Sequence, residues 1–453
     1  MTHIVICGAG IAGISAAYFL AVHHGVRSIL LVDERPPLSL TSDKSTEAYR
    51  NFWPGPDNVM IALMNRSIDL LETLARSHHN SFRMNRRGYL YATAQEDAGE
   101  QLQQAAERAA QLGGGPLRYH TTPHRYVPSP PEGFHDVPDG IDIVQGAEAI
   151  RALFPYLNPA TRQVVHIRRA GWLSAHELGM LLLERARAHG VRWLQGRVIG
   201  VERKGGRISQ VWIRQDHRER AFPADVFVNA AGPFLPDVAR LLDVDLPVFC
   251  EAHAKWMFND YQRVLPRDAP LIIWAEPQQL PWSPEERQAL EVEPDLRYLL
   301  GSLPPGVHVR PEGGEESSML LLLWGYASHP SSPHSSFSVD PLFPEIVLRG
   351  ITTAVPGFRR YWDRMPKPVI DGGYYTKTPE NLPLIGPLPV EGAYVIGALS
   401  GFGIMAACAA GELLSLHILN APLPPYAPAF HPARYTDPNL YPNLSRWSDS
   451  WQL

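Results

Sequence analysis

The sequence predicts an α/β protein, α+β overall, with one parallel-sheet domain built from discontinuous segments and a second domain inserted into it. Two observations lead to this prediction. Buried strands that run directly into glycine turns lie near the start, the middle and the end of the chain, at residues 3–13, 225–232 and 393–403. Between the last two, residues 245–345 contain β-rich pieces divided by proline-containing loops, which favours a mixed, largely antiparallel sheet.

The first element is a strand–turn–helix–strand unit. The apolar run His3–Cys7 predicts a buried strand, and a glycine turn follows it at once. Small and apolar residues over Ile14–Val22 favour a helix, which Gly25 ends. A second apolar run, Ser28–Val32, predicts the next strand, and Asp33 stands at its end. This order of elements is typical of the first half of a dinucleotide-binding, Rossmann-like fold.

The remaining elements follow from apolar periodicity and turn residues. The expected helices span 58–74, 96–112, 175–189 and 404–419. Ser174 is a suitable N-cap for the third of them. The expected strands span 191–194, 198–203, 208–214, 225–229, 254–259, 271–274, 319–326 and 393–399. The sequence Lys204–Arg207, with two central glycines, predicts a hairpin turn between two of these strands.

The composition fits a folded protein and excludes several classes of function. Of the 453 residues, 45% are hydrophobic and 43 are proline, so the proline excess does not accompany the low apolar content of a disordered chain. A formal net charge of −5 without a basic stripe argues against nucleic acid as a partner. Every apolar run is shorter than the ~18 residues that a membrane span needs, so no span is expected.

Cysteine usage indicates a reducing compartment. The 3 cysteines, at positions 7, 250 and 408, form no spaced pair, which excludes a disulfide framework and a cysteine-based zinc site. Adjacent histidines at 23–24 and 78–79 do not share a helix face, so no metal site is expected. Glycines interrupt the N-terminal apolar stretch and no basic region precedes it, so a signal peptide is not expected. We therefore expect a cytoplasmic location.

Each glycine of the GAGIAG turn has a physical role in binding a dinucleotide. Gly8 permits the tight turn, Gly10 lets a phosphate approach the backbone, and Gly13 allows the helix to pack closely on the strand. The pyrophosphate then lies on free amides at the helix N-terminus. Asp33 lies 25 residues after the first glycine, where a carboxylate can bind the ribose hydroxyls, and Glu34 is the alternative.

The scattered pieces of this fold favour FAD over NAD as the cofactor. A nicotinamide enzyme normally keeps its dinucleotide fold contiguous, whereas here a second glycine turn, Gly401-Phe402-Gly403, opens a helix near the end of the chain. A long cofactor that touches both ends of the chain suits FAD better. The N-terminus of that late helix offers backbone donors and a positive dipole end to the flavin N1 and C2 carbonyl, where negative charge collects on reduction.

Five stretches of the sequence carry a further signal: GAGIAGISAAYFL with LLVDER, TSDKST, GWLSAHEL, DVFVNAAGPF, and TPENLPLIGPL with VIGALSGFGIMAACAAGE. In this order and spacing they resemble the D-amino acid oxidase/sarcosine oxidase superfamily of FAD-dependent amine oxidoreductases, which includes glycine oxidase and dimethylglycine dehydrogenase. Together they cover most of 1–50, 165–240 and 370–420. The resemblance implies a FAD-binding domain and a substrate domain whose mixed sheet covers the flavin.

The resemblance also implies which residues contact FAD. Those matching the adenosine diphosphate contacts are Gly8, Gly10, Ile11, Ala12, Gly13, Asp33, Glu34 and Arg35. The polar loop that leads from the pyrophosphate to the isoalloxazine supplies Thr41, Ser42, Lys44, Ser45 and Thr46. Val198 matches the residue whose backbone binds adenine, and Ala231 and Gly232 match a turn near the cofactor. The segment along the pyrimidine edge of the flavin is Gly401, Phe402, Gly403, Ile404 and Met405.

Departures from the family pattern bear on covalency, substrate and electron acceptor. Ala48 stands where some relatives attach the flavin through histidine, and 373–376 matches the cysteine-containing stretch of the sarcosine oxidases, so we expect non-covalent FAD. Tyr375 and Met405 stand where relatives place a cation for the substrate carboxylate. Leu323 stands where the sarcosine oxidases have a lysine that helps oxygen react. The acceptor, oxygen or another molecule, is therefore left open.

Five residues are candidates for the substrate side of the site. Tyr374 and Tyr375 are expected as hydroxyl donors over the flavin ring, with ordinary strand aromatics as the alternative. Lys255 is the candidate to replace the missing lysine. Arg50 and Arg310 are candidate anion partners for a substrate, and a structural charge is the alternative for each.

These residues predict an FAD-dependent amine or amino acid oxidase or dehydrogenase. The expected reaction transfers a hydride from the CH–N carbon of an amine or N-substituted amino acid to the flavin N5 and gives an imine that hydrolyses. One alternative oxidises a hydroxy acid or another CH–OH donor on the same fold. A second alternative is a flavin-bearing subunit of a larger dehydrogenase complex, with 260–318 and the tail as docking surfaces. The oligomeric state is not indicated.

The expected domain boundaries follow from the order of the elements. The FAD-binding domain takes 1–85, 145–240 and 376–425, and the substrate domain takes 86–144 and 241–375. The C-terminal tail, 426–453, is expected to pack on the body through its aromatic residues Tyr441, Trp447 and Trp451.

Overall fold

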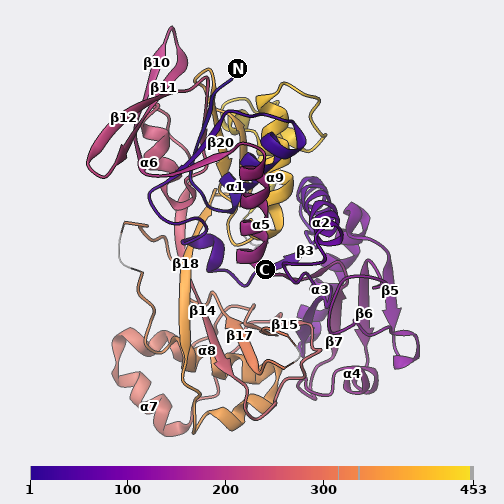
Figure 1. Ribbon diagram of the computed structural model, residues 1–453. Coiled ribbons are helices and arrows are strands. Elements are labelled where there is room, and N and C mark those ends of the chain that lie inside the picture. The colour runs from indigo at the N-terminus through magenta and orange to yellow at the C-terminus, as the bar shows by residue number, and fades with distance from the viewer. Residues whose placement is uncertain (1, 315, 335–336, 449–453) are drawn as a thin grey trace.

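The computed structural model describes residues 2–314, 316–334 and 337–448 and contains two large β-sheets, each the centre of one domain. Figure 1 shows the two domains one above the other, with the strands of the first in the upper part of the view. The predicted mixture of parallel and antiparallel sheets is confirmed.

The first domain is built on a six-stranded sheet with the order β19-β20-β13-β1-β2-β9. Its strands are β1 (Ile4–Cys7), β2 (Ile29–Asp33), β9 (Arg192–Gln195), β13 (Val226–Asn229), β19 (Leu384–Pro387) and β20 (Ala393–Gly397). All neighbours pair in parallel except β19 and β20. Continuous runs of Ile, Leu and Val suit strands that are buried on both faces. The sheet therefore combines three distant stretches of chain, as the sequence predicts.

Alternate side chains of β1 face different layers. Ile4 and Ile6 pack in one core with the helices α1 (Ile11–Tyr18), α5 (Ala175–Ala188) and α9 (Gly403–Ile418). Val5 packs in another core with Leu235 of α6 (Leu235–Arg240) and with the small antiparallel sheet of β10 (Arg197–Lys204), β11 (Arg207–Gln215) and β12 (Arg218–Pro223). This small sheet projects at the top of Figure 1.

Helices α1 and α9 approach closely because small residues line their contact. A Cβ on Gly411 would lie 2.4 Å from the Ser15 hydroxyl oxygen, so only glycine fits there. The Ser15 hydroxyl donates to the Ala407 carbonyl at 2.7 Å. The expected N-cap of α5 is also present, because the Ser174 hydroxyl accepts from the Glu177 amide at 3.3 Å. These contacts hold α1 against α9 and fix the start of α5.

The second domain is built on a nine-stranded sheet with the order β18-β14-β17-β16-β15-β4-β7-β6-β5. Its strands are β4 (Tyr89–Thr93), β5 (Leu117–His120), β6 (Ile141–Gln145), β7 (Gln163–Ile167), β14 (Phe249–Asn259), β15 (Leu271–Trp274), β16 (His308–Pro311), β17 (Met319–Leu323) and β18 (Val369–Lys377). Only β15–β4 and β5–β6 pair in parallel. The inserted, largely antiparallel sheet is thus confirmed.

The two faces of this sheet differ in chemistry because side chains alternate along each strand. One face packs against α8 (Phe343–Ala354) in an apolar core. The opposite face carries Lys255 of β14, which pairs directly with Leu323 of β17, and Leu323 pairs in turn with His308 of β16. This polar face is the one whose side chains reach the first domain.

The remaining elements lie between these strands along the chain. They are α2 (Val59–Ser77), α3 (Glu96–Ala109), α4 (Ala147–Leu153), α7 (Pro284–Val292) and the two-stranded sheet of β3 (Ala48–Arg50) and β8 (Ala170–Trp172). Helix α2 packs on α9 in the first domain. Among the described residues, no helix has both the length and the apolar character needed to cross a lipid bilayer.

Three expectations about elements need correction. Strand β7 lies in the range assigned to the FAD-binding domain but pairs with β4 and β6 of the second sheet, because its alternating side chains complete that core. Strand β12 was not expected, since its residues are polar and exposed. Helices α7 and α8 were not expected among the prolines. The signal for α7 was present, because Ser283 and Glu286 form a capping box with Pro284 as the first helical residue.

Candidate functional site

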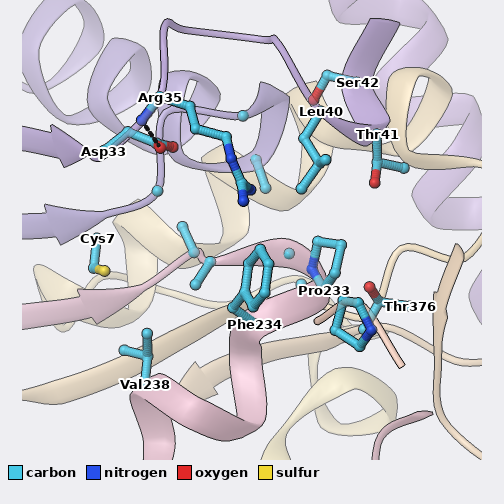
Figure 2. Close-up of a pocket in the computed structure, with 18 of the residues that line it drawn as sticks. Cys7, Asp33, Arg35, Leu40, Thr41, Ser42, Pro233, Phe234, Val238 and Thr376 are labelled. Carbon is cyan, nitrogen blue, oxygen red and sulfur yellow. Dashed lines mark hydrogen bonds between the residues drawn. The ribbon is translucent and has the colours of Figure 1, made fainter. Parts of the chain in front are cut away.

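A cavity of about 750 Å³ lies at the carboxyl ends of β1 and β2, and residues from both domains line it. Figure 2 shows Asp33 and Arg35 on one wall and Pro233, Phe234 and Val238 on the opposite wall. The crevice beyond the carboxyl ends of parallel strands is where open α/β sheets bind their ligands. The cavity therefore lies where the sequence predicts the dinucleotide site.

The glycine turn after β1 is too tightly packed for any other residue. Gly8 has φ +117°, and a Cβ there would lie 2.2 Å from the Ala230 carbonyl oxygen. A Cβ on Gly13 would lie 1.9 Å from the Gly8 carbonyl oxygen. These contacts bring the N-terminus of α1 to the cavity wall, where first-turn amides without intrahelical partners can bind an anion.

The end of β2 supports this turn from the side. The Asp33 carboxylate accepts the Ala9 amide at 2.7 Å and the Arg35 amide at 2.9 Å, and burial raises its pKa. Each carboxylate oxygen has a second lone pair, so the group can also accept from a ribose hydroxyl. Across the cavity, the Arg35 guanidinium lies 5.2 Å from the centre of the Phe234 ring, and Figure 2 shows it pointing there.

The other end of the cavity is formed by the segment before α9. Gly401 lies so close to Tyr375 that a Cβ would be 2.5 Å from the ring. Ser400 lines the cavity, and its buried hydroxyl oxygen has no hydrogen-bond partner among the described residues. A buried polar atom without a partner is unfavourable. This hydroxyl and the first amides of α9 are suited to a ligand with polar ring edges.

The polar loop at 41–46 is held by side chains of the second domain. The Lys255 ammonium donates to the Asp43 carbonyl at 3.1 Å and to the Ser45 carbonyl at 3.2 Å. The Arg310 guanidinium donates twice to the Thr46 carbonyl, at 3.0 and 2.8 Å. Here the donor belongs to the loop: the Lys44 ammonium donates to the Asp371 carboxylate of β18 at 2.9 Å. These contacts clamp the loop to the second sheet.

Both clamping cations are deeply buried. Arg310 has a relative exposure of 0% and also forms an ion pair with Glu312 at 2.6 Å. Burial lowers the pKa of the Lys255 ammonium. Neither Lys255, predicted for catalysis, nor Arg310, predicted for the substrate, lines the cavity, and both roles stay predictions.

Tyr375 lies in the cavity wall and is supported by a buried polar chain. Its ring stacks on His253, with centroids 4.0 Å apart and planes at 16°. The His253 ring nitrogen lies 3.3 Å from the Glu251 carboxylate, which accepts from the Lys377 ammonium at 3.2 Å. Burial raises the pKa of the Tyr375 hydroxyl, so the phenol stays protonated. Tyr374 also lines the cavity, and its carbonyl accepts from the polar loop.

Arg50 is a buried cation among aromatic rings rather than a residue of the cavity wall. Its guanidinium lies 4.6 Å from the ring centre of Trp53 and 5.7 Å from that of Tyr89. Its relative exposure is 3%. A cation held over aromatic faces is stabilised by ~0.5–2 kcal/mol. His308 lies in the same region, and burial together with the nearby arginines lowers its pKa to about 4.

The structure brings most of the predicted residues to one cavity. Those in its wall are Gly8, Gly10, Ile11, Ala12, Asp33, Glu34, Arg35, Thr41, Ser42, Ser45, Val198, Ala231, Gly232, Tyr374, Tyr375, Gly401, Gly403 and Ile404. Those behind the wall are Gly13, Lys44, Thr46, Arg50, Lys255, Arg310, Phe402 and Met405.

Three residues that support the site were not predicted from the sequence. His253 contacts Tyr375, Trp53 contacts Phe402, and Glu251 supports His253, but no motif contains these three residues. An indication was available for Glu251 and His253, since Glu-Ala-His places both on the same face of a strand. No group of three His, Cys, Asp or Glu side chains suited to a metal ion occurs in the described part of the chain.

The residues present fit FAD. The glycine turn and α1 offer amides to a pyrophosphate, and the Asp33 carboxylate is placed for a ribose. At the far end, Ser400 and the N-terminus of α9 offer polar groups to an isoalloxazine edge. The distance between these two ends is spanned by one continuous cavity, which an extended dinucleotide requires.

Comparison with known proteins agrees with this geometry. The profile of the DAO family, described as "FAD dependent oxidoreductase", matches residues 3–416. A search among curated protein sequences finds no match. Among solved structures, L-proline dehydrogenase from P. horikoshii is similar with a TM-score of 0.73 at 16% identity, over 96% of this chain and 98% of that one.

Two further solved structures share the fold. Glycine oxidase from Bacillus cereus ATCC 14579 has a TM-score of 0.68 at 14% identity, over 93% of this chain and 95% of that one. Iminodiacetate oxidase from Chelativorans sp. BNC1 has a TM-score of 0.68 at 16% identity, over 95% of this chain and 99% of that one.

Proposed function

Because the chain belongs to the DAO family of FAD-dependent oxidoreductases, we propose that it oxidises the CH–N bond of an amine or N-substituted amino acid to an imine. FAD supplies the hydride acceptor, its N5, and water then hydrolyses the imine. The observation that carries the proposal is the continuous cavity between the N-termini of α1 and α9, with Tyr374, Tyr375 and Thr376 of β18 in its wall. Solved structures of the same fold are named for glycine, L-proline and iminodiacetate.

The residues of this chain orient the reactants. The turn at Gly8 and the amides of α1 would hold the pyrophosphate of FAD, and the N-terminus of α9 would offer donors to its ring system. Tyr375, rigid between His253 and Gly401, presents a protonated hydroxyl to the substrate side. Arg50, buried behind the cavity wall, adds positive charge to this region, which would favour a substrate that carries a carboxylate. An amine that binds in its neutral form needs no further base.

Lys255 and Arg310 are better explained as positioning residues than as catalytic ones. They turn the carbonyl groups of Asp43, Ser45 and Thr46 toward the second sheet. Because a peptide carbonyl and the following amide point in opposite directions, this leaves the amides of the loop directed away from the sheet cations. We propose that the clamp gives the polar loop the shape that the cofactor needs.

The experiment that tests the function is anaerobic reduction of the flavin. The purified holoenzyme is mixed with a panel of primary amines, secondary amino acids and 2-hydroxy acids, and the absorbance near 450 nm is followed. We expect bleaching with one or more amino compounds and none with the hydroxy acids. Bleaching by hydroxy acids alone would replace the proposal with CH–OH oxidation. No bleaching by any compound, together with a co-purifying protein, would favour a subunit of a larger complex.

The flavin is expected to be held without a covalent bond. Ala48 offers no nucleophile, and burial raises the pKa of the Cys7 thiol to about 12, so it stays protonated although it lines the cavity. Precipitating the protein with acid and measuring the absorbance of the supernatant checks this. We expect all yellow colour in the supernatant, whereas colour that remains in the washed pellet would contradict it.

We also propose that the protein works in the cytoplasm, where thiols stay reduced. All three cysteines are free in the structure, at positions 7, 250 and 408. The electron acceptor is oxygen or another molecule, and formation of peroxide in air during turnover distinguishes the two.

A further inference from the structure

The tail of the chain contains a buried aromatic pair that contacts the segment before α2. Tyr441 and Trp447 both have a relative exposure of 7%. The Trp447 ring lies so close to Gly55 that a Cβ there would be 2.3 Å from it. The Trp447 indole donates to the Tyr441 hydroxyl at 2.5 Å, and that hydroxyl donates to Asp57 at 2.7 Å. Trp451, also expected to pack on the body, lies outside the described residues.

The segment at 55–57 is held from several sides. The Asp57 carboxylate also accepts from the Asn443 amide group at 2.8 Å and from the Val59 backbone amide, at the start of α2, at 3.2 Å. From α3, the Arg108 guanidinium donates to the Pro56 carbonyl at 2.7 Å. The tail therefore completes a rigid support and does not merely lie on the surface.

Two residues before Gly55, Trp53 connects this support to the site. Its ring meets Phe402 edge-on, with centroids 5.1 Å apart, and Phe402 is the N-cap residue of α9. The same ring carries the Arg50 guanidinium 4.6 Å from its centre. Pro54 stands between Trp53 and Gly55 and fixes its own φ, so a displacement of Gly55 moves Trp53 as well.

We propose that Trp447 is a positioning residue of the active site. By holding Gly55 in place, it fixes Trp53, and Trp53 fixes both Arg50 and the N-terminus of α9. The inference assigns the tail to the architecture of the site, and its consequence for substrate binding rests on the function proposed above. A residue near the end of the chain, Trp447, thereby positions residues near its start, Arg50 and Trp53.

The expected effect is on binding more than on the chemical step. Loss of the Trp53 ring from the Arg50 guanidinium removes a cation–π contact of ~0.5–2 kcal/mol, equivalent to a change of roughly 2- to 30-fold. We therefore expect Trp447→Ala to raise KM for the amino substrate about tenfold, with kcat changed less than about threefold. The visible circular dichroism of the bound flavin should change as well, because Phe402 moves with Trp53.

The contact can be disturbed from either side. Gly55→Ala pushes the Trp447 indole away while every residue of the tail keeps its identity. It should therefore reproduce the effect of Trp447→Ala on KM and on the flavin dichroism. Ser445→Ala, two residues away and exposed, is the matched control and should leave both unchanged. In an Arg50→Lys background, Trp447→Ala should raise KM much less than in the wild type, because both changes act on one contact.

The outcomes are distinguishable from one another. A lowered melting temperature with unchanged KM and unchanged flavin dichroism in Trp447→Ala would show a structural role only and overturn the inference. Fully additive effects of Trp447→Ala and Arg50→Lys would also overturn it. If no amine reduces the wild-type flavin, the proposed function fails, but the flavin dichroism and the FAD dissociation constant of Trp447→Ala and Gly55→Ala still decide the inference.

Discussion

Gly13→Ala is expected to give a protein that carries no flavin after purification. The added Cβ would lie 1.9 Å from the Gly8 carbonyl oxygen. Neither atom can rotate away, because the Cβ is attached directly to the backbone and the oxygen is part of it. The turn and α1 must therefore separate, which removes the amides that bind the pyrophosphate. The ratio of absorbance at 450 nm to that at 280 nm, and the FAD dissociation constant of the apoprotein, measure the loss. We expect the dissociation constant to rise at least about a hundredfold, equivalent to ~2.7 kcal/mol.

Gly99→Ala is the matched control for this prediction. Gly99 is also buried near the start of a helix, α3, but the nearest atom to an added Cβ would be 3.6 Å away, an ordinary contact. Alanine also favours the helix over glycine by ~1 kcal/mol. This variant should keep its flavin and its stability. Normal flavin content in Gly13→Ala would mean that the close contact at the turn is not needed for cofactor binding.

Arg310→Met is expected to weaken FAD binding more than tenfold and to destabilise the fold. The change removes two hydrogen bonds to the Thr46 carbonyl and leaves Glu312 without its partner. Removing one member of a buried ion pair costs ~3–5 kcal/mol, and the lower end applies here because Glu312 is one-third exposed. The polar loop then loses its fixed shape, which accounts for the effect on the cofactor. Thermal unfolding with and without added FAD measures both effects.

Arg87→Met separates the general effect of losing a buried arginine from the effect on the loop. Arg87 lies over the same Trp172 ring as Arg310, at 4.9 and 5.2 Å respectively. Its guanidinium donates to the Pro131 and Arg267 carbonyls, away from the loop. We expect Arg87→Met to lower stability while the FAD dissociation constant stays close to that of the wild type. Equal weakening of FAD binding in both variants would contradict the assignment of Arg310 to the loop.

The features that the sequence predicts correctly are those whose cause is local. The strand–turn–helix unit at Gly8 and the late helix after Gly401 are each set by a few neighbouring residues, so their positions follow from pattern alone. Strand β15 matches its expected range, 271–274, because a short apolar run between prolines has few alternatives. The discontinuous first domain follows from the order of such units along the chain.

The features that could not be predicted depend on contacts across the two domains. Lys255 reaches the Ser45 carbonyl over a separation of 210 residues, and Arg310 reaches Thr46 over 264. Nothing near a buried cation in the sequence indicates that its partner is a distant backbone carbonyl rather than a substrate. In the same way, the stack of His253 on Tyr375 is set by the register of β14 with β18.

The strand order of the first sheet has a consequence for how the protein is made. Strand β1 lies between β2 and β13, and β13 pairs with β20, which is nearly 400 residues from the N-terminus. On the ribosome, the first strands leave the exit tunnel long before the strand and helix that complete the cavity exist. Until then the cavity has only part of its wall, although α1 and α5 already pack on one face of β1 and β2. We therefore expect FAD to meet its complete site only once β20 and α9 have been made.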